Sequence, residues 1–378
     1  MQKPYHIVFT TIFNPENILQ ALFDNISKYH HLDKVKIWIV GDKKTPSINA
    51  EQAVKFSKQG LETEFFSVEN QDKWGHDLDF YPRVPYNNTT RRNFGFLKAL
   101  EAGCRVLISI DDDNFPTDDD FIGCYTQVGK EYAGGLVSEP AGFHNICEYL
   151  EFEPARPIYA RGFPFRLRSH RNQPTVQPAP KQARIGVLEG LWLVEPDIDA
   201  VTWLNGKVIS KQFRGQELTA LQQGTWSPIN FQNTALLRQL LPAILALPMG
   251  WPVPGGKIER YDDVWGGYFL QAAMQGSPYY MAFGRPIVEH RRNPHNYLDD
   301  LRGEFWGIIL TDWLVEKLKG EFRSSRNKLD ERMLDLADFV ERSAEDLPQW
   351  RPQEMKDFII RTAGSMRMWV KACGRIGI

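Results

Sequence analysis

The sequence predicts an α/β fold with a mostly parallel sheet, followed by a helical C-terminal region. Two observations support this fold class. Over residues 1–110, segments typical of strands alternate with helical segments, which is the pattern of an α/β layer with a parallel sheet. From about Leu301 onward, apolar residues recur at helical spacing. Between these regions, short strand-like runs are separated by Gly, Pro and aromatic residues.

The first strand is expected in YHIVFTTIF, and the first helix in PENILQALFDNISKYHH, whose apolar residues share one face. A second strand, KVKIWIVGDKKTP, ends in a turn at Gly41 and Asp42. A weaker third strand, TEFFSV, follows the helical AEQAVKFSKQG. TTRRNFGFLKALEAG is expected to be a helix that is capped by Thr89 or Thr90 and stops at Gly103. It leads directly into the strand RVLISI.

Beyond Asp120 the pattern becomes irregular. The Pro- and Gln-rich segment 169–183 is typical of a mobile surface loop, and NTALLRQLLPAILALPMG (233–250) is expected to be helical before its prolines. Three further helical segments follow: GEFWGIILTDWLVEKLKGEF, KLDERMLDLADFVERSAED and PQEMKDFIIRTAGSMRMWVKAC. We therefore predict an α/β body to about residue 300 and a helical subdomain after it.

The composition is that of a soluble globular protein, with 42% hydrophobic and 24% charged residues in 378. A net charge of -2 argues against nucleic-acid binding through bulk electrostatics. The four cysteines lie far apart without a CxxC pair, which favours reduced thiols in the cytoplasm over disulfides or a zinc site. The N-terminus lacks the features of a signal peptide, and no stretch reaches the roughly 18 apolar residues of a membrane span. We expect a cytoplasmic protein without nucleic-acid partners or membrane spans.

The strand VLISI ends in three consecutive aspartates, Asp111 to Asp113. Two carboxylates about 5 Å apart repel by about 3 kcal/mol at an effective dielectric near 20, a cost that a bound cation would offset. Because open α/β sheets bind ligands beyond the carboxyl ends of their strands, Mg²⁺ or Mn²⁺ carrying a diphosphate suits this position. The alternative is a solvated acidic turn. For Asp118 to Asp120, after Pro116, we favour a helix N-cap instead.

Three other motifs carry chemically useful side chains. Arg161 precedes Gly162 in YARGFPFRLR, where a guanidinium could approach a phosphate closely, although a stacked surface arginine is the commoner case. The pair Asp262 and Asp263 in ERYDDVWGGYF could hold sugar hydroxyls, or could simply begin a helix. His290 ends a strand-like run before two arginines and is either a metal ligand or a structural histidine.

Taken in order, five motifs resemble those of the reversibly glycosylated polypeptides, the UDP-arabinopyranose mutases of plants, and their bacterial relatives. The motifs are the aspartates 111–113 after a strand, Arg-Gly-aromatic-Pro-Phe at 161–165, GLWLVEPDIDA (190–200), RYDDVWGG (260–267) and the strand-end His290. The resemblance covers roughly Tyr5 to Phe305. It implies a glycosyltransferase-A type fold. On this basis we predict a catalytic domain over 1–300, divided into a nucleotide-binding half (1–125) and a sugar or acceptor half (126–300), and a helical subdomain over 301–378.

The resemblance also implies roles for ten residues. As cofactor it implies Mn²⁺ or Mg²⁺, ligated by Asp113, Asp111 and His290. Contacts to the nucleotide are implied for Thr10, Asp42, Arg92, Asp111 and Asp112. The implied catalytic residues are Arg161, which matches the reversibly glycosylated arginine of the family, and Asp262 and Asp263, which would face the sugar.

The implied function is that of a metal-dependent UDP-sugar enzyme of polysaccharide biosynthesis, foremost a pyranose–furanose mutase. Two alternatives stay open: a retaining glycosyltransferase with a glycan acceptor, and a non-catalytic subunit that binds a nucleotide-sugar. In the latter case the C-terminal helices could form a homo- or hetero-oligomer through an apolar stripe; the alternative is that this stripe packs on the protein's own body. The stripe consists of Ile359, Ile360, Met366 and Trp369. A metal-dependent nucleotidyltransferase is less favoured, because no glycine-rich phosphate loop follows the first strand.

Overall fold

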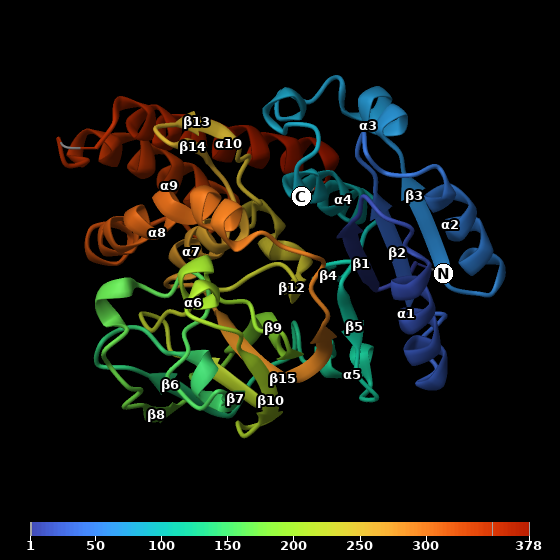
Figure 1. The fold of residues 1–378 in the computed structure, drawn as a ribbon, viewed down its shortest axis with the longest axis horizontal. Coiled ribbons are helices and arrows are strands. Elements are labelled where there is room, and N and C mark those ends of the chain that lie inside the picture. Colours follow the sequence, from blue (N-terminus) through green and yellow to red (C-terminus); the bar gives the residue numbers. More distant parts are fainter. Residues whose placement is uncertain (1, 350, 378) are drawn as a thin grey trace.

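Four parallel strands form the core of the N-terminal part in the computed structural model, which describes residues 2–349 and 351–377. In spatial order they are β3 (Glu62–Phe66), β2 (Val35–Val40), β1 (Tyr5–Thr10) and β4 (Val106–Ile110). The helices that connect them are α1 (Glu16–Lys28), α2 (Ile48–Lys58), α3 (Val68–Gly75) and α4 (Arg92–Glu101). All five residues of β4 are buried, as expected for a parallel strand covered on both faces. The carboxyl ends of β1 and β4 therefore meet at one edge, as the sequence predicts (Figure 1).

The sheet continues beyond β4 as a mixed sheet of thirteen strands within the described ranges. Next to β4 and antiparallel to it lies β12 (Asn233–Leu237), then come β9 (Arg184–Val194), β15 (Tyr279–His290), β11 (Leu218–Leu221), β6 (Gly135–Ser138) and β8 (Thr175–Pro178). Three strands lie off this path: β5 (Asn114–Pro116), β7 (Leu150–Glu153) and β10 (Ile209–Phe213). The pairing of β5 with the end of β15 sets His290 opposite Asn114. It thereby brings two motifs that are far apart in sequence to the same edge.

Several local predictions are wrong in instructive ways. Residues 233–250 begin as strand β12 and continue as a 3-10 turn (Arg238–Ala243), because β12 fills the slot between β4 and β9 and a proline follows. Part of the segment 169–183 is strand β8, which pairs with β6. The turn before α4 is capped by Asn88 rather than by a threonine. The N-cap prediction is confirmed for Asp120, which accepts from the amide of Gly123 at the start of α5 (Phe121–Tyr125).

The remaining helices lie mostly at the other end of the molecule, and the last one, α10, runs from there back to α4 (Figure 1). They are α6 (Ala200–Leu204), α7 (Asp262–Met274), α8 (Tyr297–Gly320), α9 (Leu329–Ser343) and α10 (Gln353–Ile376), with a small hairpin of β13 (Trp251–Val253) and β14 (Gly256–Ile258) beside them. The expected apolar stripe of α10 is core. Ile359, Met366 and Trp369 are fully buried, and only Ile360 is partly exposed. Trp369 packs edge-on against Phe80 of the N-terminal half and donates to the Leu241 carbonyl. The stripe is thus used to attach α10 to the protein's own body.

Candidate active site

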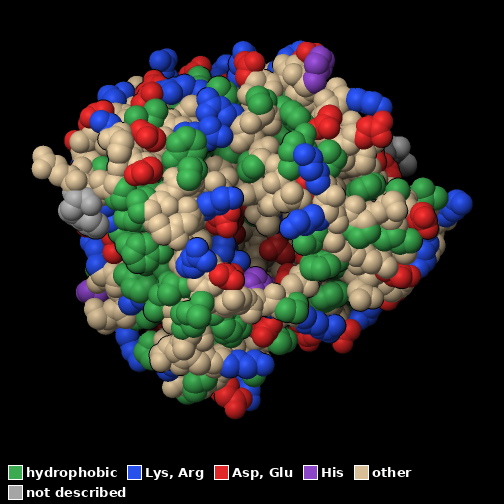
Figure 2. Space-filling model, turned by 45° about the horizontal axis from the view of Figure 1, so that its top comes forward, with side chains coloured by type: hydrophobic (Ala, Val, Ile, Leu, Met, Phe, Trp, Pro, Cys, Tyr) green, Lys and Arg blue, Asp and Glu red, His purple; other side chains and the backbone are tan. Residues whose placement is uncertain are grey.

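A cavity of about 350 Å³ opens at the carboxyl ends of β1 and β4, a volume within the range of small-molecule sites. A hollow with Lys and Arg side chains around it, a histidine at its edge and acidic side chains in its depth is visible in Figure 2. Nine of the ten residues singled out in the sequence line this cavity: Thr10, Arg92, Asp111, Asp112, Asp113, Arg161, Asp262, Asp263 and His290. Eight of them come from the ends of β1, α4, β4, α7 and β15, and Arg161 comes from a turn.

Asp42 is the exception among the ten. Its carboxylate accepts from the backbone amides of Lys43 and Asn88. It therefore holds the segment 87–89, whose residues do line the cavity. In the structure Asp42 thus fixes a neighbouring loop, and its direct contact with a nucleotide stays a prediction.

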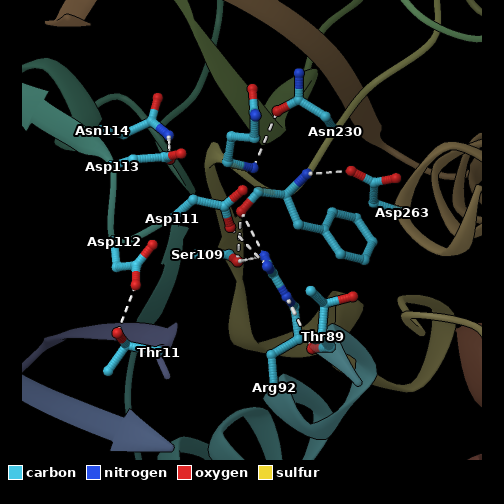
Figure 3. Close-up of polar contacts among 12 residues, drawn as sticks. Thr11, Thr89, Arg92, Ser109, Asp111, Asp112, Asp113, Asn114, Asn230 and Asp263 are labelled. Atoms are coloured by element: carbon cyan, nitrogen blue, oxygen red, sulfur yellow. Dashed lines mark hydrogen bonds and ion pairs between the residues drawn. The ribbon is translucent and has the colours of Figure 1, made fainter. Parts of the chain in front are cut away.

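Asp111 is paired with the buried Arg92. The guanidinium donates through Nη2 to Asp111 Oδ1 at 2.6 Å and through Nη1 to Ser109 Oγ and the Phe231 carbonyl (Figure 3). Burial disfavours the charge on Arg92, but Asp111 outweighs it and raises the pKa of the guanidinium. Arg92 therefore compensates the first of the three aspartates and fixes its orientation.

Asp112 is the least compensated of the three aspartates. Burial, followed by the charges of Asp113 and Asp111, raises the pKa of its carboxyl to about 7. The one short contact is with Thr11, whose Oγ1 donates to Oδ2 at 2.5 Å (Figure 3). The repulsion expected from the sequence is thus present, and an added cation would relieve it.

Asp113 faces His290. The imidazole Nδ1 lies 2.7 Å from the Glu195 carbonyl, which fixes the tautomer with hydrogen on Nδ1 and leaves Nε2, 3.5 Å from Asp113 Oδ1, towards the cavity. Burial favours the neutral imidazole, but Asp113 outweighs it and raises the pKa of His290. Asn293 adds two donors to Asp113, its backbone amide at 3.2 Å and its side-chain amide at 3.3 Å.

A complete metal site is not formed by these side chains alone. Within the described part of the chain, no three His, Cys, Asp or Glu residues are grouped closely enough to hold an ion. Asp111, the third ligand implied by the resemblance, is turned to Arg92. Asp113 and His290 remain as an oxygen and an imidazole donor side by side, a donor set that suits Mn²⁺.

Arg161 is buried at the cavity wall with all five N–H groups in use. It forms a bidentate pair with Asp197 at 2.9 and 3.1 Å and a second with Asp263 at 2.9 and 3.1 Å, and it also donates to the Arg260 carbonyl. The two carboxylates outweigh burial and raise its pKa well above the ordinary value. Gly162 follows with φ +84°, and a Cβ there would lie 2.2 Å from Val264. The Arg-Gly motif thus serves close packing against α7.

Asp262 and Asp263, the first two residues of α7, differ sharply. Asp263 is ion-paired with Arg161. Asp262 has only Thr89 Oγ1 at 3.5 Å, and burial, followed by the charge of Asp263, raises its pKa to about 7. Two adjacent carboxyl groups with such different environments can take different roles in catalysis.

Sequence reasoning missed several residues of the site. Asp197, the partner of Arg161, lay within the quoted motif GLWLVEPDIDA, but nothing in its spacing set it apart. Arg260 and Arg292 also line the cavity. Arg260 has the left-handed φ of 62° and pairs with Glu304 and Asp300.

Arg292 is the cation with a free donor at this wall. Its side chain is 8% exposed and stacks on Trp203, and its Nη1 has no hydrogen-bond partner among the described residues. Arg291, the other half of the basic pair noted in the sequence, pairs with Glu289 and lines a different groove. The cavity therefore contains both an incompletely compensated carboxyl, Asp112, and an arginine with a free donor, Arg292.

A family model described as "Reversibly glycosylated polypeptide" matches residues 22–377. The chain belongs to this family. Its parallel β3–β2–β1–β4 core, extended by antiparallel β12, has the glycosyltransferase-A type α/β architecture that the resemblance implies, so that prediction is confirmed. The division into domains at residues 125 and 300 stays a prediction.

The curated relatives are plant proteins. The chain is 28% identical over 228 residues to probable UDP-arabinopyranose mutase 1 of Pisum sativum, covering 59% of this chain and 57% of that protein. It is 28% identical over 232 residues to UDP-arabinopyranose mutase 3 of Arabidopsis thaliana, with the same coverage of 59% and 57%. The chain thus spans less than two thirds of the length of these relatives.

Solved structures with a similar chain trace are distant. S. aureus TarS 1-349 in complex with UDP-GlcNAc has a TM-score of 0.45 at 11% identity, over 95% of this chain and 81% of that chain. Glucosyl-3-phosphoglycerate synthase from Mycobacterium tuberculosis, in complex with Mn²⁺, UDP and phosphoglyceric acid, has a TM-score of 0.38 at 14% identity, over 85% and 80%. Among the described helices, none is long and apolar enough to cross a membrane.

Proposed function

We propose that the protein is a UDP-sugar enzyme, and most specifically a nucleotide-sugar pyranose–furanose mutase that works with Mn²⁺ or Mg²⁺. The observation that carries the proposal is that one cavity holds both Asp112, a carboxyl that needs a positive neighbour, and Arg292, a cation with a free donor. A diphosphate is anionic and chelates divalent cations, so a diphosphate with its cation would satisfy both groups. The names of the curated relatives support the UDP-sugar and the mutase chemistry.

The metal would be held by Asp113 and His290, with Asp112 and Asp111 beside them. The fit rests on the contact of His290 Nδ1 with the Glu195 carbonyl, which turns Nε2 towards Asp113 and the cavity, and on the raised pKa of Asp112, which marks a carboxyl in need of a positive neighbour. When bound, a divalent cation would offset the charge that develops on the departing diphosphate.

The protein's own residues supply binding and proton handling. Arg292, with its free donor, would bind a phosphate oxygen, and Arg260 would add positive charge beside it. Asp262 would lie under the sugar. Because its pKa is about 7, it can accept the proton of the sugar hydroxyl that attacks the anomeric carbon as UDP leaves. It would return this proton to the former ring oxygen when the bond from that oxygen to the anomeric carbon breaks and the UDP oxygen bonds to this carbon again. The reaction is an isomerisation and needs no further reactant.

Arg161 would act through Asp263 in this conformation. With five donors engaged and a raised pKa, its guanidinium has no free lone pair for attack on a sugar. Reversible glycosylation of Arg161, which the resemblance implies, would require both ion pairs to open first. We therefore propose that Arg161 primarily holds the Asp263 carboxylate in place through their two hydrogen bonds.

The test is incubation of the protein with UDP-arabinopyranose and, separately, with UDP-galactopyranose, each with Mn²⁺, followed by chromatography of the nucleotide-sugars. The proposal predicts a furanose product from at least one of them. If no furanose forms and UDP is released only when a glycan acceptor is added, the protein is a glycosyltransferase. If neither occurs but UDP-sugar binds, it is a non-catalytic subunit. We also propose a cytoplasmic location, supported by the four unpaired cysteines.

A further inference from the structure

A second cavity, of about 560 Å³, lies away from the proposed active site. It is formed by the C-terminal ends of α7 and α8, the segment after α8, Arg332 of α9 and the turn around Gly224. Asp262 is at one end of α7 and this cavity at the other, about 20 Å away along a helix of 13 residues. The proposed function makes no use of it.

Three cations line this cavity, and no carboxylate does, as far as the described residues go. They are Lys319, Arg323 and Arg332. Within the described ranges none of the three has an ion-pair partner; their recorded hydrogen bonds go to backbone carbonyls. Asp335 accepts from Ser324, a residue of the cavity, but its ion-pair partner is Arg326. The three cations of the cavity are therefore without an ion-pair partner among the described residues.

Lys319 forms part of the floor. Its Nζ donates to the carbonyls of Gly142 and Gly224 and lies 4.9 Å from the ring centroid of Trp226. Burial, followed by the charge of Arg166, lowers its pKa to about 8. An anion bound in the cavity would raise the pKa of Lys319 back towards the ordinary value for lysine.

The two arginines have a structural role as well. Arg332 donates to the Ala273 and Gln275 carbonyls and so caps the end of α7, while Arg323 donates to carbonyls at the end of α8. Capping explains why the guanidinium groups lie here. Capping does not neutralise the three positive charges around the cavity, because backbone carbonyls carry only partial negative charge.

The cavity also has an aromatic wall with an unused donor. Trp226 is 2% exposed, and its indole N–H has no partner within the described residues. Phe322 provides a second aromatic side chain, and Ser324 a hydroxyl. Several cations favour a dianion over a single carboxylate, and the volume exceeds what a bare phosphate needs. We propose that this cavity binds a small phosphorylated metabolite of sugar-phosphate size, with its phosphate on Lys319 and Arg323 and its organic part against Trp226.

The test is isothermal titration calorimetry of the full chain with glucose 1-phosphate, inorganic phosphate and glucose. We expect glucose 1-phosphate to bind about tenfold more tightly than phosphate, and glucose not to bind. Arg323→Ser and Lys319→Met should each weaken binding by about tenfold or more, because each removes one charged contact. Arg342→Ser, which removes an exposed arginine of α9 outside the cavity, should leave binding unchanged.

Circular dichroism verifies that each variant is folded. Arg323 is exposed, so its replacement keeps the test valid even if Lys319→Met is poorly folded. Three results would overturn the proposal: no binding of glucose 1-phosphate at millimolar concentration, equal affinity for phosphate and glucose 1-phosphate, or affinity that survives Arg323→Ser. The last result would place the ligand elsewhere, for instance in the cavity at the strand ends.

Discussion

Replacement of Asp262 by Asn is expected to stabilise the protein while it removes activity. The pKa of this carboxyl is raised from 3.8 to about 7 in the folded protein. Between these two values the unfolded chain releases the proton and the folded chain retains it, so the folded state loses stability as the pH rises. Relative to a residue that does not titrate, Asp262 thus lowers the free energy of unfolding by about 1.5 kcal/mol at pH 5 and by about 4 kcal/mol at pH 8.5. Asn cannot ionise and avoids this cost.

The assay is urea unfolding of the wild type and Asp262→Asn at pH 5 and pH 8.5, followed by circular dichroism. The variant should be the more stable protein, and its advantage should grow by about 2–3 kcal/mol between the two pH values. Turnover should fall by about 100-fold or more, as expected for loss of a proton-transferring group.

Asp263→Asn is the matched control, one residue along the same helix. Asp263 is paired with the buried Arg161, so its loss should destabilise the protein by about 3–5 kcal/mol at pH 8.5. The reasoning is refuted if Asp262→Asn is less stable than the wild type at pH 8.5, or if the difference between them does not depend on pH.

Three further predictions concern side chains that line the cavity. Asp113→Ala should abolish Mn²⁺-dependent binding of UDP in calorimetry, and unchanged binding would place the ion elsewhere. Arg292→Gln should weaken UDP binding by about 10- to 100-fold, the value of one charged hydrogen bond. Arg291→Gln, a change in the neighbouring groove, should leave UDP binding unchanged. Equal effects of the two variants would contradict the role of Arg292 in phosphate binding. Arg161→Ala should lower the free energy of unfolding by about 3–5 kcal/mol, because it leaves two buried carboxylates without an ion-pair partner. The loss of unfolding free energy should be smaller at pH 5, because carboxylates without their arginine partner can take up protons there. A loss that does not depend on pH would contradict this explanation.

The sequence was sufficient for the elements with strong local signals. Apolar β4 followed by three aspartates identified the strand end and its edge of the sheet, and the five ordered motifs identified the family. Residues at strand and helix ends could be assigned to one cavity because parallel strands must end at a common edge. Nine of ten such residues lie there.

Partners fixed by tertiary structure could not be predicted. The pairing of Arg161 with Asp197 and Asp263 joins residues 36 and 102 positions apart, and no local pattern encodes it. For the same reason the contact of Asp42 with a backbone amide 46 positions away could not be predicted. Strand β12 was mistaken for a helix because a short apolar run is ambiguous until its neighbours are known.

The most direct test of the proposed site is a crystal structure with UDP and Mn²⁺. The diphosphate should lie between the aspartates that follow β4 and Arg292, with one ion in contact with both Asp113 and His290. UDP bound outside this cavity, or an ion that contacts neither Asp113 nor His290, would contradict the account.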